Sequence, residues 1–360
     1  MPREAINTPR QKLELNGVRM SLDLKRFIAA MFLFCISGQA LAVENWPAEP
    51  WTQATLLTTL DSDFQNNLSG VYWNESTQTA WACLNGPGKF WAIKKDAQSG
   101  QFSIDIKDSN RGEWTPGGDL EGITQVDENA DLVYVLVEGD DYIRAYDTSV
   151  YGVVSLDQEW SIGAHVPTSG GAGSEGLTFV PDQWLASSGF TNSSGVPYTS
   201  QNGMGGLMFV AHQNGGKIYV FDLDPLSSSF TFVGAYSTSR SDSSGLEFDR
   251  NLGLLYIWHN PSNINYLEVS DLGSTLIGGG RKLNTIKEFL GPKTGNLEGF
   301  AIEPYTGAPQ QAMVVDDDNN SGAAFMVFDQ FEPGLPPAIE DDTFCFPIVG
   351  TGGRVAVVCL

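Results

Sequence analysis

The sequence predicts an all-β fold from three observations. Short runs rich in β-branched and aromatic residues follow one another along the chain, and turn residues separate them every 8 to 12 positions. Helical periodicity is absent from these runs. A short phrase with an acid or serine before glycine also recurs five times, as "NLSGVYWNE", "DLEGITQVD", "GSEGLTFVP", "SSGLEFDRN" and "NLEGFAIEP".

The recurring phrase has a regular spacing. Its acid or serine positions are separated by 52, 54, 69 and 54 residues, and they are Ser69, Glu121, Glu175, Ser244 and Glu298. A self-similar period of this length is typical of a β-propeller, in which each repeat forms one four-stranded blade. The long interval contains a Ser/Gly/Asn-rich insertion near residues 184–205, which we interpret as a surface loop.

The repeats predict five visible blades within residues 43–335. The fifth repeat lacks a clear fourth strand, but the run Thr55–Leu60 lies before the first repeat and could supply it. Closure of the ring by the N-terminal part of the chain would remove exposed sheet edges. The alternative is six blades, one of them degenerate and built from the C-terminal segment.

The first 42 residues have the pattern of an upstream extension followed by a cleaved signal peptide. Lys25 and Arg26 precede an apolar run, and Ala40-Leu41-Ala42 supplies the small residues of a cleavage site. These residues carry six of the 20 Lys/Arg and three of the 43 Asp/Glu, so the rest of the chain has a net charge of about −26. We therefore expect an exported bacterial protein, periplasmic or extracellular, without a membrane span and without affinity for nucleic acid.

The segment 336–360 is expected to form a β-hairpin. Two β-rich runs flank a Gly-rich turn, which would place Cys345 opposite Cys359. In an exported protein such a pair is expected to form a disulfide. Cys83 would then be a buried, unpaired thiol.

The recurring phrase also predicts a site. A blade begins with its innermost strand, so one side chain per blade would form a ring at the mouth of the central channel. Glu121, Glu175 and Glu298 would repel one another there unless a cation lies among them, and calcium suits several carboxylate ligands. The alternative is ordinary turn chemistry, in which each carboxylate caps backbone N–H groups of a neighbouring blade.

A second ring is expected further from the axis, where the second strand of each blade ends. Its residues are Asn85, Glu138, His212, His259, Asp316 and Asp317. Together with Ser69 and Ser244, the non-histidine members are candidate ligand-binding residues. His212 and His259 occupy equivalent positions in adjacent blades, which makes them candidate catalytic bases, although a strand-end histidine is commonly structural.

The phrases "LSGV", "LEGI", "SEGL", "SSGL" and "LEGF" resemble those of the SdiA-regulated and phytase-like exported bacterial β-propellers, over roughly residues 55–330. This resemblance implies a calcium-stabilised propeller, with its pocket on the face of the acidic ring and, in some members, phosphoester hydrolysis. The chain departs from this pattern because no cluster of Lys and Arg lies near the rings. Lactonase-type propellers combine a channel calcium with nearby histidines. The ring acids of this chain, together with His212 and His259, resemble that arrangement in position.

Two functions remain open from the sequence. The first is a calcium-dependent hydrolase of esters, lactones or phosphoesters at the channel mouth, with Glu121, Glu175 and Glu298 as metal ligands. The second is a non-catalytic binding or scaffold propeller that holds a small molecule, glycan or protein and contains a structural ion. Propellers support both classes, so the fold does not choose between them.

Overall fold

A computed structural model describes residues 41–167, 172–318, 322–335, 345–349 and 355–359. The predicted targeting segment lies outside the described residues, apart from its last two positions. Residues up to Leu41 and residues from Ala42 onward form separate units, and the account below concerns the second unit. No helix in the described part of the chain is long and apolar enough to cross a bilayer.

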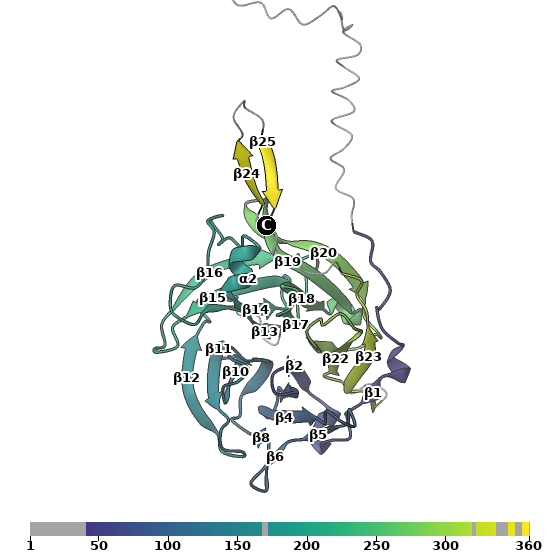
Figure 1. Ribbon diagram of the computed structural model, residues 1–360. Helices are drawn as coiled ribbons and strands as arrows, with labels where there is room; N and C mark the ends of the chain where they lie inside the picture. Colours follow the sequence, from purple (N-terminus) through teal and green to yellow (C-terminus); the bar gives the residue numbers. More distant parts are fainter. Residues whose placement is uncertain (1–40, 168–171, 319–321, 336–344, 350–354, 360) are drawn as a thin grey trace, which may run out of the picture. The chain divides into compact units, whose positions relative to one another are not determined.

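The chain forms a five-bladed β-propeller (Figure 1), so the predicted fold is confirmed. The innermost strands β2, β9, β13, β17 and β21 contact one another in sequence, and β21 returns to β2. This closed ring leaves no place for a sixth blade among the described residues. Within each blade, neighbouring strands are antiparallel.

Blades 1 and 2 follow the predicted order of strands. Blade 1 contains β2 (Leu68–Asn74), β3 (Thr79–Leu84), β4 (Lys89–Lys95), β5 (Phe102–Ile104) and β8 (Glu113–Trp114), and a small hairpin of β6 (Ile106–Lys107) and β7 (Asn110–Arg111) interrupts its outer edge. Blade 2 contains β9 (Asp119–Thr124), β10 (Leu132–Glu138), β11 (Tyr142–Asp147) and β12 (Ser155–Ser161).

Blades 3 and 4 share one eight-stranded sheet, because the outer strands β16 and β20 pair in parallel at Tyr236 and Arg281. Blade 3 contains β13 (Ser174–Pro181), β14 (Gly206–His212), β15 (Lys217–Leu223) and β16 (Phe230–Ser237). Blade 4 contains β17 (Gly245–Asp249), β18 (Leu254–His259), β19 (Tyr266–Ile277) and β20 (Gly280–Leu290).

Blade 5 is closed by the start of the described chain, as the sequence predicts. It contains β21 (Leu297–Ile302), β22 (Gln310–Asp316) and β23 (Phe325–Phe331), and β1 (Thr55–Leu56) pairs with β23 as its outer strand. Outside the blades, the described residues include short 3₁₀ helices at Trp51–Gln53, Ser62–Gln65 and Pro261–Asn263.

The insertion in blade 3 differs from the predicted surface loop. It contains the short helix α2 (Asp182–Ser187), and the side chains of Leu185 and Phe190 are buried in the core. The buried carboxylate of Asp222 holds the loop by accepting hydrogen bonds from the hydroxyl of Tyr198, at 2.9 Å, and the amide of Gln201, at 2.7 Å. Composition predicted a segment without strands here, but it did not predict the helix, the buried side chains or the contact of Tyr198 with Asp222.

The C-terminal segment contains the predicted hairpin. Strand β24 (Cys345–Val349) pairs with β25 (Val355–Cys359), and Cys345 is opposite Cys359 in the register. The disulfide between them stays a prediction. Cys83 is a free, buried cysteine, as expected.

The core consists of the faces between adjacent blades. Clusters of large apolar side chains fill these interfaces, and the aromatic members include Trp73, Trp91, Trp114, Trp160 and Trp258. Their packing fixes each blade against its neighbours, and therefore fixes the distances between the starts of the five innermost strands.

Candidate functional site

The recurring phrase encodes a β-bulge at the start of the innermost strand in four blades. In blade 2, Gly122 is opposite Leu136 and Leu120 is opposite Val137, so Glu121 is the extra residue. The register shifts in the same way around Ser69, Glu175 and Glu298. A bulge re-aims the side chain of the extra residue. The spacing of the repeated phrase predicted that these positions are equivalent, but it did not predict the bulge.

The glycine of each phrase permits the close approach of neighbouring blades, as predicted. A Cβ atom on Gly122 would lie 2.6 Å from the backbone nitrogen of Leu177, and one on Gly299 would lie 2.5 Å from the carbonyl oxygen of Ser69. The other three glycines face similar collisions with backbone atoms of the next blade. These collisions run around the whole ring, so the phrase is first of all a packing signature.

All five side chains of the predicted inner ring are buried: Ser69, Glu121, Glu175, Ser244 and Glu298. The channel inside this ring encloses only about 10 Å³, which is close to the space of one water molecule. An organic ligand therefore cannot enter the channel here, whereas a single ion at its mouth meets no such limit.

Burial and mutual repulsion disfavour the ionised form of the ring glutamates. Burial, followed by the charges of Glu175 and Glu298, raises the pKa of Glu121 well above its ordinary value. Burial and the charge of Glu138 raise the pKa of Glu175 to about 8. Burial and the charge of Asp317 raise the pKa of Glu298 strongly. Each carboxyl therefore favours its protonated form below this raised pKa, and a nearby cation would favour the ionised form instead.

Two oxygen atoms in the ring lack hydrogen-bond partners. Within the described residues, no donor or acceptor reaches Oγ of Ser244 or Oε2 of Glu298. The hydroxyl of Ser69 donates to the carboxylate of Glu121, and its hydrogen bond to Glu298 lowers the pKa of that carboxyl without offsetting burial. Buried polar atoms are normally satisfied, and an ion is one way to satisfy such oxygens.

A compact carboxylate group lies on blade 2. Asp119, Glu121 and Glu138 each offer one oxygen, and these three atoms lie within 4.8 Å of one another. Asp119 and Glu138 are direct cross-strand neighbours. Sequence reasoning missed Asp119, although it stands two residues before Glu121 and side chains at i and i+2 share one face of a strand.

Part of the predicted alternative, turn chemistry, is also present. The backbone amide of Gly173 hydrogen-bonds to Glu138 and to Glu175. A Cβ atom at position 173 would lie too close to Oε1 of Glu138, so a larger residue there would displace this carboxylate. These carboxylates therefore have local partners without being fully neutralised by them.

Blade 5 joins the same cluster through an asparagine that the sequence analysis did not select. The Nδ2 of Asn296 lies 2.9 Å from Oε1 of Glu298 and 3.0 Å from Oδ2 of Asp317. Asn85 reaches the other oxygen of Asp317 at 3.4 Å. Asp316 differs, because its buried carboxylate is ion-paired with Lys293 at 2.5 Å. Of the predicted outer ring, Asp317 is thus connected to the inner ring through Asn296, whereas Asp316 is paired with a lysine instead.

The two histidines have buried, structural surroundings. His212 is completely buried, and its ring nitrogens lie 3.2 Å and 3.0 Å from the carbonyl oxygens of Asn214 and Pro167. Both nitrogens therefore face backbone carbonyl oxygens of the protein, and a neutral ring can donate to only one of them. This arrangement leaves no ring nitrogen directed at a ligand.

His259 forms a buried ion pair. Its Nε2 lies 2.9 Å from a carboxylate oxygen of Glu268, and its Nδ1 lies 2.7 Å from the carbonyl oxygen of Asp242. Burial alone would raise the pKa of Glu268, but the hydrogen bond and charge of His259 outweigh burial and lower this pKa to about 2. The equivalent positions of the histidines therefore correspond to two different structural roles.

No family model and no curated protein matches the chain. Solved structures similar to it include a nidogen/laminin complex, with 11% identity over 70% of this chain and 76% of that chain at a TM-score of 0.37. A protein from Lactobacillus plantarum has 16% identity over 81% and 70% at a TM-score of 0.38. Sqt1 from Saccharomyces cerevisiae has 9% identity over 80% and 69% at a TM-score of 0.32.

Proposed function

We propose that this chain is a non-catalytic, cation-binding β-propeller whose acidic ring holds calcium at the channel mouth. The observation that carries the proposal is the set of buried glutamates at positions 121, 175 and 298, together with the unpartnered Oε2 of Glu298. Hard oxygen ligands in this number suit calcium better than a softer metal. Asp119 and Glu138 extend the set of candidate ligands.

A bound calcium ion would supply positive charge that allows the ring carboxylates to ionise. It would also connect side chains from blades 2, 3 and 5, and so stabilise the closed ring of blades. The resemblance to calcium-stabilised exported propellers agrees with this role and with export, which we include in the proposal. A small molecule, glycan or protein partner would then bind outside the narrow channel.

We propose no hydrolytic role for His212 or His259. A general base needs a ring nitrogen within reach of the water it activates. The nitrogens of both residues instead contact backbone carbonyls or Glu268. The binding alternative therefore fits the geometry better than hydrolysis of esters, lactones or phosphoesters.

The test is the thermal midpoint of the chain from residue 43, measured with chelator and after calcium is restored, together with its metal content as purified. A ligand at a hundredfold excess over its dissociation constant stabilises the folded state by about 2.7 kcal/mol. We expect a rise of several degrees with calcium and a smaller one with magnesium.

The variant Glu298→Gln should lose most of this rise, because it removes one charged ligand and keeps the side-chain shape. Asp157→Asn is the matched control, since Asp157 is an exposed carboxylate on the outer strand of blade 2. A calcium response that is absent, or equally strong in Glu298→Gln, would contradict the proposal.

A further inference from the structure

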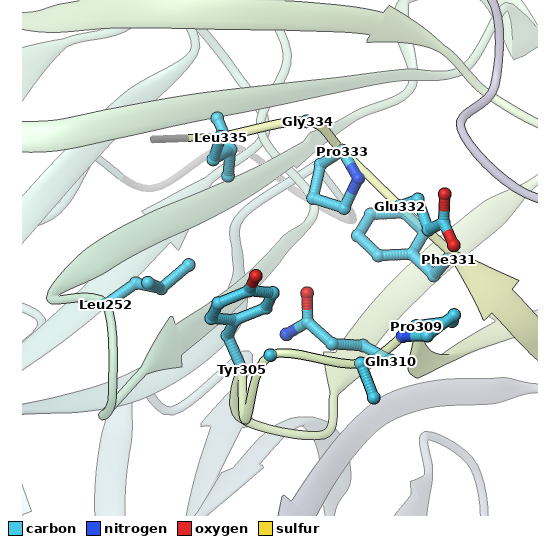
Figure 2. Close-up of a pocket in the computed structure, with 11 residues that line it drawn as sticks. Leu252, Tyr305, Pro309, Gln310, Phe331, Glu332, Pro333, Gly334 and Leu335 are labelled. Atoms are coloured by element: carbon cyan, nitrogen blue, oxygen red, sulfur yellow. The ribbon is translucent and has the colours of Figure 1, made fainter. Parts of the chain in front are cut away.

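A second pocket lies at the opposite end of blades 4 and 5 from the acidic ring. Strands β17 and β21 begin at the ring and end beside this pocket, which has a volume of about 220 Å³. Figure 2 shows its mainly apolar and aromatic walls, which include Leu252, Tyr305, Pro309, Phe331, Pro333 and Leu335. A cavity of about 150 Å³ admits benzene, so this pocket has room for one ring and a short chain.

The pocket contains a hydrogen-bond acceptor with a fixed orientation. Gln310 is 3% exposed, and its Nε2 lies 2.6 Å from the carbonyl oxygen of Glu303 and 3.3 Å from Oδ2 of Asp249. Both partners are acceptors, so the amide nitrogen must face them. The amide oxygen then points away from these two acceptors, on the side of Tyr305 (Figure 2).

A single buried carboxylate holds two of the three segments that line this pocket, namely the loops that follow β17 and β21. Asp249 accepts hydrogen bonds from the backbone amides of Asn251, at 2.8 Å, Leu252, at 2.9 Å, and Tyr305, at 3.2 Å. The loops are therefore preorganised, and a ligand would lose little free energy in ordering them.

The charge around the pocket favours a cationic ligand. Glu332 lines the pocket and is exposed. Lys287, the cation that contacts this wall, donates to the carbonyl oxygen of Pro333 at 2.9 Å and to Glu44 at 3.3 Å. None of the residues that line the pocket is a lysine or arginine. An anionic ligand would therefore meet the charge of Glu332 without compensation.

We propose that this pocket binds a small amphipathic amine, with a primary ammonium group next to one aromatic ring or a branched alkyl group. The ammonium donates a hydrogen bond to Oε1 of Gln310 and lies near Glu332. The apolar part contacts Leu252, Pro333 and Leu335, and the rings of Tyr305 and Phe331 add favourable cation–π or ring contacts.

The experiment compares three probes of equal size by calorimetry and ligand-observed NMR: phenethylamine, 2-phenylethanol and phenylacetate. We expect the amine to bind most tightly and phenylacetate to show no binding. The measurement is made in saturating calcium, so that the acidic ring is not available as a second site for the amine.

Two variants locate the binding. Ala308→Phe fills the pocket from an exposed loop position and should abolish amine binding, while Ala308→Ser should leave it unchanged. Glu332→Gln should weaken binding about three- to fivefold, whereas the matched control Asp157→Asn should not. Preference for phenylacetate, absence of amine binding, or amine binding that survives Ala308→Phe would each overturn the proposal.

Discussion

At the scale of single residues, the acidic ring shows how position changes the chemistry of an ordinary side chain. A glutamate on the surface ionises freely, whereas Glu175 is buried beside other carboxylates and its pKa is raised to about 8. Loss of its proton without a cation would leave an uncompensated charge in the interior, which is costly. The ring can therefore be neutralised in two ways, by protons or by a cation.

These pKa values predict how stability depends on pH when calcium is absent. Between the ordinary pKa of glutamate and the raised pKa of each ring carboxyl, the unfolded chain has released the protons of Glu121, Glu175 and Glu298, while the folded chain retains them. For Glu175 this window extends toward about pH 8. The unfolded state then binds fewer protons, so the free energy of unfolding falls as pH rises. For Glu175 alone the loss by pH 8 is a few kcal/mol, at about 1.4 kcal/mol per pKa unit.

Urea unfolding in chelator at several pH values from 5 to 8.5 measures this slope. Saturating calcium should reduce the slope, because it favours the ionised form in the folded state. Glu175→Gln should reduce it as well, since glutamine does not titrate. A flat profile for the unmodified chain in chelator would mean that these carboxyls titrate near their ordinary pKa.

The histidines show the limit of sequence reasoning at this scale. The sequence correctly gave His212 and His259 equivalent positions at the ends of β14 and β18. It could not reveal their partners, because Pro167 lies 45 residues from His212 and Glu268 belongs to the next strand of the blade. Hydrogen-bond partners depend on the folded backbone, so a catalytic and a structural histidine have the same sequence signal.

At the scale of elements, the start of each innermost strand carries a glycine, and in four of the five blades a bulge accompanies it. The bulge aims one side chain toward the ring, and the glycine allows the next blade to approach. This pairing explains why the phrase is repeated in blades whose ring residue is serine rather than glutamate. The packing requirement applies to every blade, whereas an acid occupies only three of the five positions.

We therefore expect that replacing the glycine of a repeated phrase lowers the free energy of unfolding. Gly122→Ala should cost about 1–3 kcal/mol, because its methyl group would overlap the backbone of Leu177. Gly280→Ala is the matched control, since its Cβ would meet no atom within 4 Å and its φ is not in the left-handed region. Urea denaturation should show a lower midpoint for Gly122→Ala and no decrease for Gly280→Ala. An equal change of the urea midpoint in both variants would contradict the explanation that these glycines are needed for close packing of the blades.

At the scale of the whole molecule, the start of the described chain closes the ring. Thr55 and Leu56 pair with β23, and the amide of Leu57 donates to the carbonyl oxygen of Phe325 at 2.9 Å. The indole of Trp46 packs against Phe328 and Phe331, with ring centroids 5.1 Å and 5.4 Å apart. These contacts join segments that lie more than 260 residues apart in the sequence.

Trp46→Ala tests this closure. The substitution should lower the free energy of unfolding by about 2–3 kcal/mol, somewhat less than for a fully buried tryptophan, because Trp46 is partly exposed. Leu56→Ala is the control, since Leu56 is 44% exposed and should change stability little. Thermal unfolding with the same midpoint in both variants would contradict a stabilising role for the closing segment.

The sequence by itself determined the all-β class, the five repeats, the ring glycines and the N-terminal closure, because these follow from local periodicity and from a phrase that each blade must repeat. It also predicted that Glu121, Glu175 and Glu298 occupy equivalent positions at the starts of three innermost strands. Only the tertiary structure decided that Asp119 and Asn296 lie beside these glutamates. It also decided that Asp316 and both histidines contact other protein groups, and that a pocket lies at the far end of blades 4 and 5. Those outcomes depend on contacts between distant segments, which the packing of the blades fixes and local sequence patterns do not encode.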